Sequence, residues 1–158
     1  MIRSSQVVVL DPQAGTVLLI QRGDLPLWVL PGGVAEVGES AEAAAAREAF
    51  EETGYQVRVE RQTGEYACPQ LGRGGSLASV FLATIVGGQA IESGPETRAV
   101  RWFPLAALPR AMPRLHRQRL ADALADDPLV IRRTQLLRPW HAVLLRAFLW
   151  LRDRARQR

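Results

Sequence analysis

The chain has 158 residues, of which 47% are hydrophobic and 23% are charged. This length fits one domain with an appended element, and the composition excludes an intrinsically disordered chain. The single cysteine, Cys68, excludes an internal disulfide framework and a cysteine-based zinc site, and we expect it within or beside a strand. The sequence shows neither a secretory signal nor an uncharged apolar run of about eighteen residues, so a cytoplasmic location is expected by default.

The net charge of +4 is distributed unevenly, and every residue in the Lys+Arg total is an arginine. The segment from Arg132 to Arg158 holds eight arginines and one acidic residue, Asp153, so the preceding chain is slightly acidic. A basic tail alone is a weak indication of nucleic-acid binding. We therefore expect no nucleic-acid partner.

The first third of the chain combines strand patterns with one helix. Residues 6–10 and 16–21 predict two strands joined by a turn, and Pro31, Gly32 and Gly33 predict a tight turn whose backbone can approach a ligand closely. Residues 41–53 are rich in strong helix formers and predict a helix. Its predicted N-cap is Ser40 and its predicted C-terminal stop is Gly54. At 100° per residue, one side of this helix gathers Ala43, Ala46, Phe50 and Thr53, and Glu48, Glu51 and Glu52 lie on the other.

The remaining elements indicate a mixed α+β domain with a helical C-terminal extension. Domain boundaries are expected at residues 1–125 for the domain and 126–158 for a basic amphipathic helical extension. Strands are predicted at 55–60, 65–68, 79–86 and 99–103, a glycine-rich loop at 72–75, and helices at 115–125 and 139–151.

Glu48 and Glu52 stand one helical turn apart, so their carboxylates repel each other. A bound hard cation would compensate, and Mg²⁺ accepts carboxylate oxygens while taking other ligands from water and substrate phosphates. A lone pair of glutamates on a helix is more often a solvated face. The glycines that precede the helix favour the metal site instead, because a backbone carbonyl of the turn can complete the metal shell.

Residues 33–55 resemble the Nudix box, and this resemblance is the most specific feature of the sequence. The pattern is Gly, five residues, Glu, seven residues, then Arg-Glu-apolar-any-Glu-Glu-any-Gly-apolar. The sequences LWVLPGG upstream and ETRAVRWFPLAALP at residues 96–109 are also similar to the family, so the likeness covers roughly residues 5–125. The positions that match the box are Gly33, Glu39, Arg47, Glu48, Ala49, Glu51, Glu52, Gly54 and Tyr55.

The resemblance implies a Nudix fold, in which a mixed β-sheet is sandwiched with the Nudix helix, and a Mg²⁺-dependent hydrolase for which Mn²⁺ can substitute. It assigns the metal to Glu48 and Glu52, with Glu51 and a carbonyl of Gly33 or Gly32 added. Arg47 would be structural and pair with Glu51, and Glu39 would brace the loop before the helix. The general base is a glutamate of the helix or Glu96, whose position varies within the family, so its role stays open.

The implied reaction is attack by water on the pyrophosphate linkage of a nucleoside diphosphate derivative, such as ADP-ribose, a sugar nucleotide or a (d)NTP. Pro69 and residues 96–109 favour the ADP-ribose type faintly. Tyr66 could stack on a base, although an aromatic residue in a strand is more often part of the core. Arg73 could contact a phosphate, although an arginine on a loop is more often simply solvated. His116 and His141 receive no catalytic role.

Two alternatives concern the whole chain. A non-catalytic Nudix module that senses a nucleotide or binds a protein is the alternative to an enzyme, but such modules usually lose acids from the box, and this chain keeps them. The apolar stripe of the C-terminal segment could pack on the domain, form a homodimer, or lie on an anionic membrane surface. We favour packing on protein, because apolar stripes usually face protein.

Overall fold

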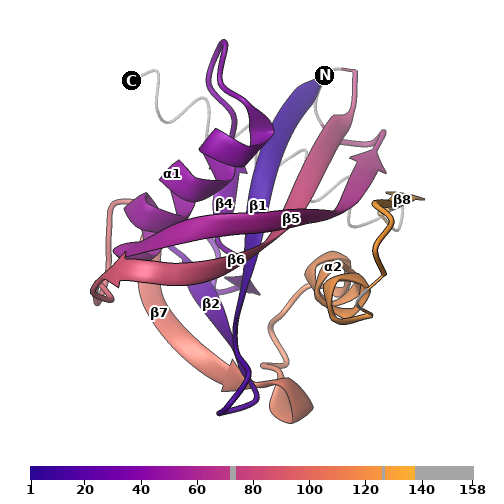
Figure 1. The fold of residues 1–158 in the computed structure, drawn as a ribbon. Helices are drawn as coiled ribbons and strands as arrows, with labels where there is room; N and C mark the ends of the chain where they lie inside the picture. The colour runs from indigo at the N-terminus through magenta and orange to yellow at the C-terminus, as the bar shows by residue number, and fades with distance from the viewer. Residues whose placement is uncertain (72–73, 126, 138–158) are drawn as a thin grey trace.

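Strand β1 (Ile2–Asp11) runs through the centre of the computed structural model, which describes residues 1–71, 74–125 and 127–137 (Figure 1). The other strands are β2 (Thr16–Arg22), β3 (Trp28–Val29), β4 (Gly32–Val34), β5 (Tyr55–Cys68), β6 (Ser76–Gly88), β7 (Thr97–Pro104) and β8 (Ile131–Thr134). The helices are α1 (Ala41–Thr53), a 3₁₀ turn η1 (Leu105–Ala107) and α2 (Arg114–Leu124).

The strands form one mixed sheet in the order β3-β2-β1-β6-β5-β8, with β4 also paired to β1 and β7 to β2. The β1–β6 and β5–β8 pairs are parallel, and the other pairs are antiparallel. Strand β1 changes partner along its length, because Ser4–Gln6 pair with β4 whereas Leu10 and Asp11 pair with β2. The predicted α+β architecture with a mixed sheet is confirmed.

The two helices cover opposite faces of β1, because successive side chains of a strand point to opposite sides. Val7 and Val9 are buried in a cluster that includes Ala45 of α1. Val8 is buried in a second cluster that includes Leu120 of α2. Figure 1 shows α1 lying alongside β1 and β4, and α2 lying beneath the other end of the sheet.

Helix α1 begins and ends where its capping residues predict. The Ser40 hydroxyl accepts a hydrogen bond from the Ala43 N–H over 3.1 Å. Gly54 adopts a left-handed φ of 77°, and its N–H donates to the Phe50 carbonyl over 2.8 Å. A side chain at Gly54 would overlap the Gln89 carbonyl oxygen, so both conformation and space require glycine.

The side of α1 that packs on the sheet is not the apolar side expected from the helical spacing, which included Phe50. Phe50 is 51% exposed, and the buried residues are Ala44, Ala45, Ala49 and Thr53. Small side chains allow the helix axis to approach the sheet closely, which a phenylalanine at the contact would prevent. Glu48 and Glu52 consequently lie at the border of the packed side, where they are partly buried.

The two strands predicted at 55–60 and 65–68 are one continuous strand, β5. Its pairing with β6 shifts register between Val59 and Arg61 and again between Gln62 and Gly64. Such irregularities bend a strand without ending its pairing, which explains why the local pattern breaks there. Cys68 is buried at the end of β5, as expected.

Residues 131–134 differ from the predicted helical extension, because they form β8 and pair in parallel with β5 from Gly64 to Ala67. An edge strand of four residues carries too short a pattern to be recognised locally. The helix predicted at 139–151 lies outside the described residues. Within residues 1–137, apart from the three undescribed positions, the longest helices are too short and too polar to cross a bilayer.

Candidate active site

The carboxylate of Glu52 contacts the start of β4. The N–H of Gly32 donates a hydrogen bond to Oε2 of Glu52 over 2.7 Å. The pKa of Glu52 is raised to about 8, chiefly because the carboxyl is buried, while the Gly32 hydrogen bond acts to lower it. The negative charges of Glu48 and Glu96 also raise this pKa. A carboxyl group buried among other acids is one that a cation would stabilise in its ionised form.

Two adjacent glycines let β4 approach its neighbours closely. A Cβ at Gly33 would overlap the Glu48 carboxyl group, and one at Gly32 would overlap the Ser5 carbonyl oxygen. Gly32 also has φ of 148°, a region open mainly to glycine. The predicted tight turn is therefore wrong in detail, because Gly32 and Gly33 belong to a short strand paired with β1. The predicted close backbone approach is present.

Arg47 connects three of the acidic residues. Its guanidinium donates to both carboxylate oxygens of Glu39 at 2.9 and 3.0 Å, and to Glu48 at 3.0 Å and Glu51 at 3.1 Å. Glu39 in turn accepts the Glu36 N–H over 2.9 Å, so it joins the loop to the helix. The pKa of Arg47 is raised by its bonds to Glu39 and Glu48. The Arg47–Glu51 contact expected from the sequence is therefore present.

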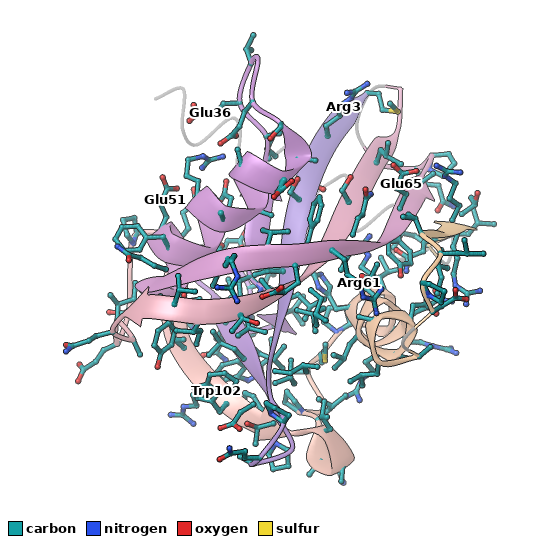
Figure 2. All side chains as sticks on the ribbon, viewed as in Figure 1. Arg3, Glu36, Glu51, Arg61, Glu65 and Trp102 are labelled. Atoms are coloured by element: carbon teal, nitrogen blue, oxygen red, sulfur yellow. The ribbon has the colours of Figure 1, made fainter. Side chains whose placement is uncertain are left out.

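The three box glutamates have unequal surroundings. The side chain of Glu51 is 55% exposed and that of Glu48 is 14% exposed. Figure 2 shows Glu51 on the outer side of α1, away from the sheet. Burial raises the pKa of Glu48, and the hydrogen bond from Arg47 opposes the rise. Glu48 and Glu52 are therefore the inner pair, whereas Glu51 reaches the cluster from solvent.

Glu96, immediately before β7, and Arg22, the last residue of β2, act electrostatically on the same cluster. The Gly23 N–H donates to the Glu96 carbonyl over 2.8 Å, which joins the two strand ends. The charge of Glu96 raises the pKa values of Glu48 and Glu52, and the charge of Arg22 lowers that of Glu52. Arg22, which binds Asp24 at 2.6 Å, was not among the residues that the sequence pattern predicted for the site. A single arginine at the end of a strand belongs to no spaced motif, so nothing in the sequence marks it as a site residue.

The donor set fits a hard divalent cation. Carboxylate and carbonyl oxygens are its preferred ligands, and the inner pair is buried beside backbone made accessible by Gly33. Among the described residues, no group of three or more His, Cys, Asp or Glu side chains stands ready as a complete metal site. Oε1 of Glu48 and Oε2 of Glu51 both accept from Arg47, so one oxygen of each carboxylate is already engaged in this arrangement.

Three other residues considered from the sequence have different outcomes. Tyr66 is fully buried and its hydroxyl donates to Asp122 over 2.9 Å, so stacking on a base is excluded in this conformation and the core alternative holds. Arg73 lies outside the described residues. His116 Nδ1 accepts the Leu30 N–H over 3.3 Å, and burial lowers its pKa to about 3, which keeps it neutral.

The sequence profile of the NUDIX domain matches residues 1–126. The chain belongs to the Nudix family. A Bacillus subtilis (strain 168) protein provisionally named an 8-oxo-dGTP diphosphatase is 42% identical over 106 residues, covering 67% of this chain and 68% of that protein. The ADP-ribose pyrophosphatase of Methanocaldococcus jannaschii is 36% identical over 98 residues, covering 60% and 57%.

A crystal structure of a NUDIX hydrolase from Nitrosomonas europaea is similar with a TM-score of 0.72. The match covers 86% of this chain and 79% of the Nitrosomonas europaea chain at 20% identity, which supports the Nudix fold. The predicted family, fold and enzyme class are confirmed, and the chain is a Nudix pyrophosphohydrolase. Nudix hydrolases generally use a divalent metal ion.

Proposed function

We propose that this Nudix hydrolase uses Mg²⁺ to cleave the pyrophosphate linkage of a nucleoside diphosphate derivative by attack of water at phosphorus. The observation that carries this proposal is the inner pair, Glu48 and Glu52, buried beside Gly33. Two partly buried acids at this spacing repel each other, which a cation would offset, and Mg²⁺ leaves coordination positions for substrate phosphates. Mn²⁺ is the expected substitute.

Glu48 and Glu52 would hold the ion, with Glu51 and the carbonyl of Gly33 as further ligands. When bound, Mg²⁺ supplies charge that neutralises the diphosphate and lowers the pKa of water. A glutamate of the helix cluster, Glu51 or Glu52, or else Glu96 would accept the proton of the attacking water. Arg47 would orient Glu51 through the bond described above, and it holds Glu48 until an ion binds. Most of the rate enhancement then comes from positioning and electrostatics.

The candidate substrates are ADP-ribose, sugar nucleotides and (d)NTPs. The names of the two relatives include 8-oxo-dGTP and ADP-ribose, which supports the nucleotide class and leaves both members in the panel. The small nucleotide is the proposed partner. A homodimer and contact of the C-terminal segment with a membrane surface remain secondary proposals, the second less favoured.

Phosphate release from a nucleotide panel, with and without Mg²⁺, tests the proposal. The panel comprises ADP-ribose, sugar nucleotides, dNTPs, 8-oxo-dGTP, diadenosine polyphosphates and NADH, coupled to a phosphatase where needed. We expect Mg²⁺-dependent turnover that Glu52→Gln lowers by at least about 100-fold, because loss of a metal ligand should exceed loss of an outer contact. Glu42→Gln, an exposed change on the same helix, is the matched control and should retain activity.

Absence of turnover for every substrate, in a folded protein that still binds nucleotides, would contradict the proposal. That result would favour the sensing module. Turnover that persists in Glu52→Gln would contradict the assigned metal site while leaving the reaction type intact.

A further inference from the structure

Ser5 of β1 carries a buried hydroxyl that needs a partner. The residue is 1% exposed, and its Oγ has no hydrogen-bond partner within the described part of the chain. A hydroxyl removed from water without a compensating hydrogen bond is unfavourable. Such a group in a native structure calls for an explanation, and a bound species or a moving side chain can supply the missing partner.

The Ser5 side chain points to the face of the sheet that α1 covers. Residues two apart on a strand share a face. Val7 and Val9, which follow Ser5 at this spacing, are buried with Ala45 and Ala49 of α1. The hydroxyl therefore lies between β1 and the helix that carries the box glutamates (Figure 1).

The strand register places Ser5 directly beside Gly33, its antiparallel partner on β4. Side chains of directly paired residues stand on the same face with Cβ atoms about 4.5–5.5 Å apart. The space that a Cβ at Gly33 would take is occupied by the carboxyl group of Glu48. Ser5 and the Glu48 carboxylate therefore occupy adjoining positions on one face of the sheet.

We propose that Ser5 is a positioning residue of the metal site, whose hydroxyl donates a hydrogen bond to the Glu48 carboxylate when that carboxylate turns to bind the divalent ion. This inference rests on the metal site of the proposed function. In the structure, Oε1 of Glu48 accepts from Arg47 over 3.0 Å. Rotation toward the ion exchanges this exposed-side contact for the buried hydroxyl. Outer hydrogen bonds of this kind fix the orientation of a ligating carboxylate.

A purely structural role for Ser5 makes a different prediction. A hydroxyl that only stabilises the fold should lower thermal stability when it is removed. If the hydroxyl has no partner in the metal-free protein, its removal should leave the thermal stability unchanged or raise it, because the burial of an unpaired hydroxyl is unfavourable. Ser5→Ala therefore separates the two roles through measurements made with and without metal.

The test is Mn²⁺ binding to the full-length, EDTA-stripped protein, followed by the electron paramagnetic resonance signal of free Mn²⁺. Ser79 supplies the matched control, because it pairs with Ser5 from the opposite side, on β6, and is also buried. We expect Ser5→Ala to raise the Mn²⁺ dissociation constant about tenfold. Ser79→Ala should change it less than twofold. The metal-free melting temperature of Ser5→Ala should equal or exceed that of the wild type.

The target of the hydroxyl is tested by combining variants. In a Glu48→Gln background, Ser5→Ala should raise the Mn²⁺ dissociation constant by less than a further twofold, because the effects of two interacting groups are not additive. In a Glu51→Gln background, Ser5→Ala should keep its full effect, because the effects of independent groups add. If the wild type binds Mn²⁺ and Ser5→Ala binds it with the same dissociation constant, the result overturns this inference but not the metal site. A lower metal-free melting temperature in Ser5→Ala overturns it in favour of a structural role. Wild-type protein that binds no Mn²⁺ overturns the metal site itself and this inference with it.

Discussion

Glu48, Glu51 and Glu52 are chemically identical, and their surroundings give them different properties. Glu52 is buried against Gly32, Glu48 is buried but bonded to Arg47, and Glu51 is largely exposed. Burial penalises the charged form, so the pKa is raised most at Glu52. At the residue scale, burial therefore disfavours the ionised carboxylates of the proposed metal site, and a cation would stabilise them.

The raised pKa of Glu52 predicts how the stability of the metal-free protein depends on pH. Between the unfolded value of 4.5 and the folded value of about 8, the folded chain keeps a proton that the unfolded chain has lost. The free energy of unfolding should therefore decrease as pH rises through this window, by up to about 1.4 kcal/mol per pH unit. Below pH 4.5 the contribution is fully present. Urea unfolding in EDTA from pH 4.5 to 8 measures it.

The control for this measurement is Glu52→Gln, which lacks the titrating group. Its difference from the wild type isolates Glu52, because other groups cancel, including His116, whose lowered pKa gives the opposite slope between about pH 3 and 6.5. A wild-type minus variant difference that stays constant with pH would contradict the prediction. If Mg²⁺ binds at Glu52, saturating Mg²⁺ should remove the Glu52 contribution to the pH dependence of the wild type.

At the scale of elements, α1 has well-defined ends but its neighbours decide which residues it buries. The caps at Ser40 and Gly54 satisfy backbone groups locally. The packed side follows from how closely the helix sits on β1, which favours alanines over Phe50. Since Glu48 and Glu52 border that side, the same packing sets how deeply the two carboxylates are buried.

Ser40→Ala tests the contribution of the cap. We expect the free energy of unfolding to fall by about 1 kcal/mol, because the Ala43 N–H loses its acceptor. Activity at a temperature well below unfolding should change less than twofold, since the cap lies at the far end of α1 from Glu52. Urea unfolding of Ser40→Ala beside Ser93→Ala, an exposed loop serine, provides the measurement and its control. Equal stability of the two variants would show that the cap contributes nothing.

At the scale of the whole molecule, residues beyond the helical part of the domain complete the fold. The Arg133 guanidinium binds both oxygens of Asp122 at 2.8 Å, which ties β8 to α2. Oε1 of the Gln135 side chain accepts from the buried Arg119 guanidinium over 2.7 Å, and the backbone N–H of Gln135 donates to the Ala67 carbonyl. A boundary at residue 125 would therefore remove partners of buried charged groups.

Two truncations separate the role of β8 from that of the C-terminal segment. A chain that ends at Leu129 should lose at least about 1–3 kcal/mol of unfolding free energy relative to one that ends at Leu137, because Asp122 and Arg119 lose hydrogen-bond partners. Urea unfolding of both chains measures this difference. Equal stability would show that β8 is dispensable.

The chain that ends at Leu137 also tests the secondary proposals for residues 138–158. If this segment lies on membranes, the truncation should abolish binding to anionic liposomes that the full chain shows. If it forms a dimer, the truncation should halve the mass measured by light scattering. Unchanged behaviour in both assays would contradict both proposals and favour packing on the domain.

The family, the ends of α1 and the identity of the box acids could all be predicted from local sequence patterns. These features depend on spacing along a single helix and its caps, such as Ser40, Gly54 and the four-residue step from Glu48 to Glu52. Neighbours in the chain are sufficient to specify them, because capping and helical periodicity are local properties.

The assembly of the site, in contrast, depends on contacts between segments that are far apart in the chain. Pairing of β1 with β4 brings Ser5 beside Gly33, and packing of α1 then places the Glu48 carboxyl group against Gly33. The burial of Tyr66 and the presence of β8 also depend on partners far along the chain. Strand register and helix packing arise from contacts between distant residues, so no local pattern specifies them.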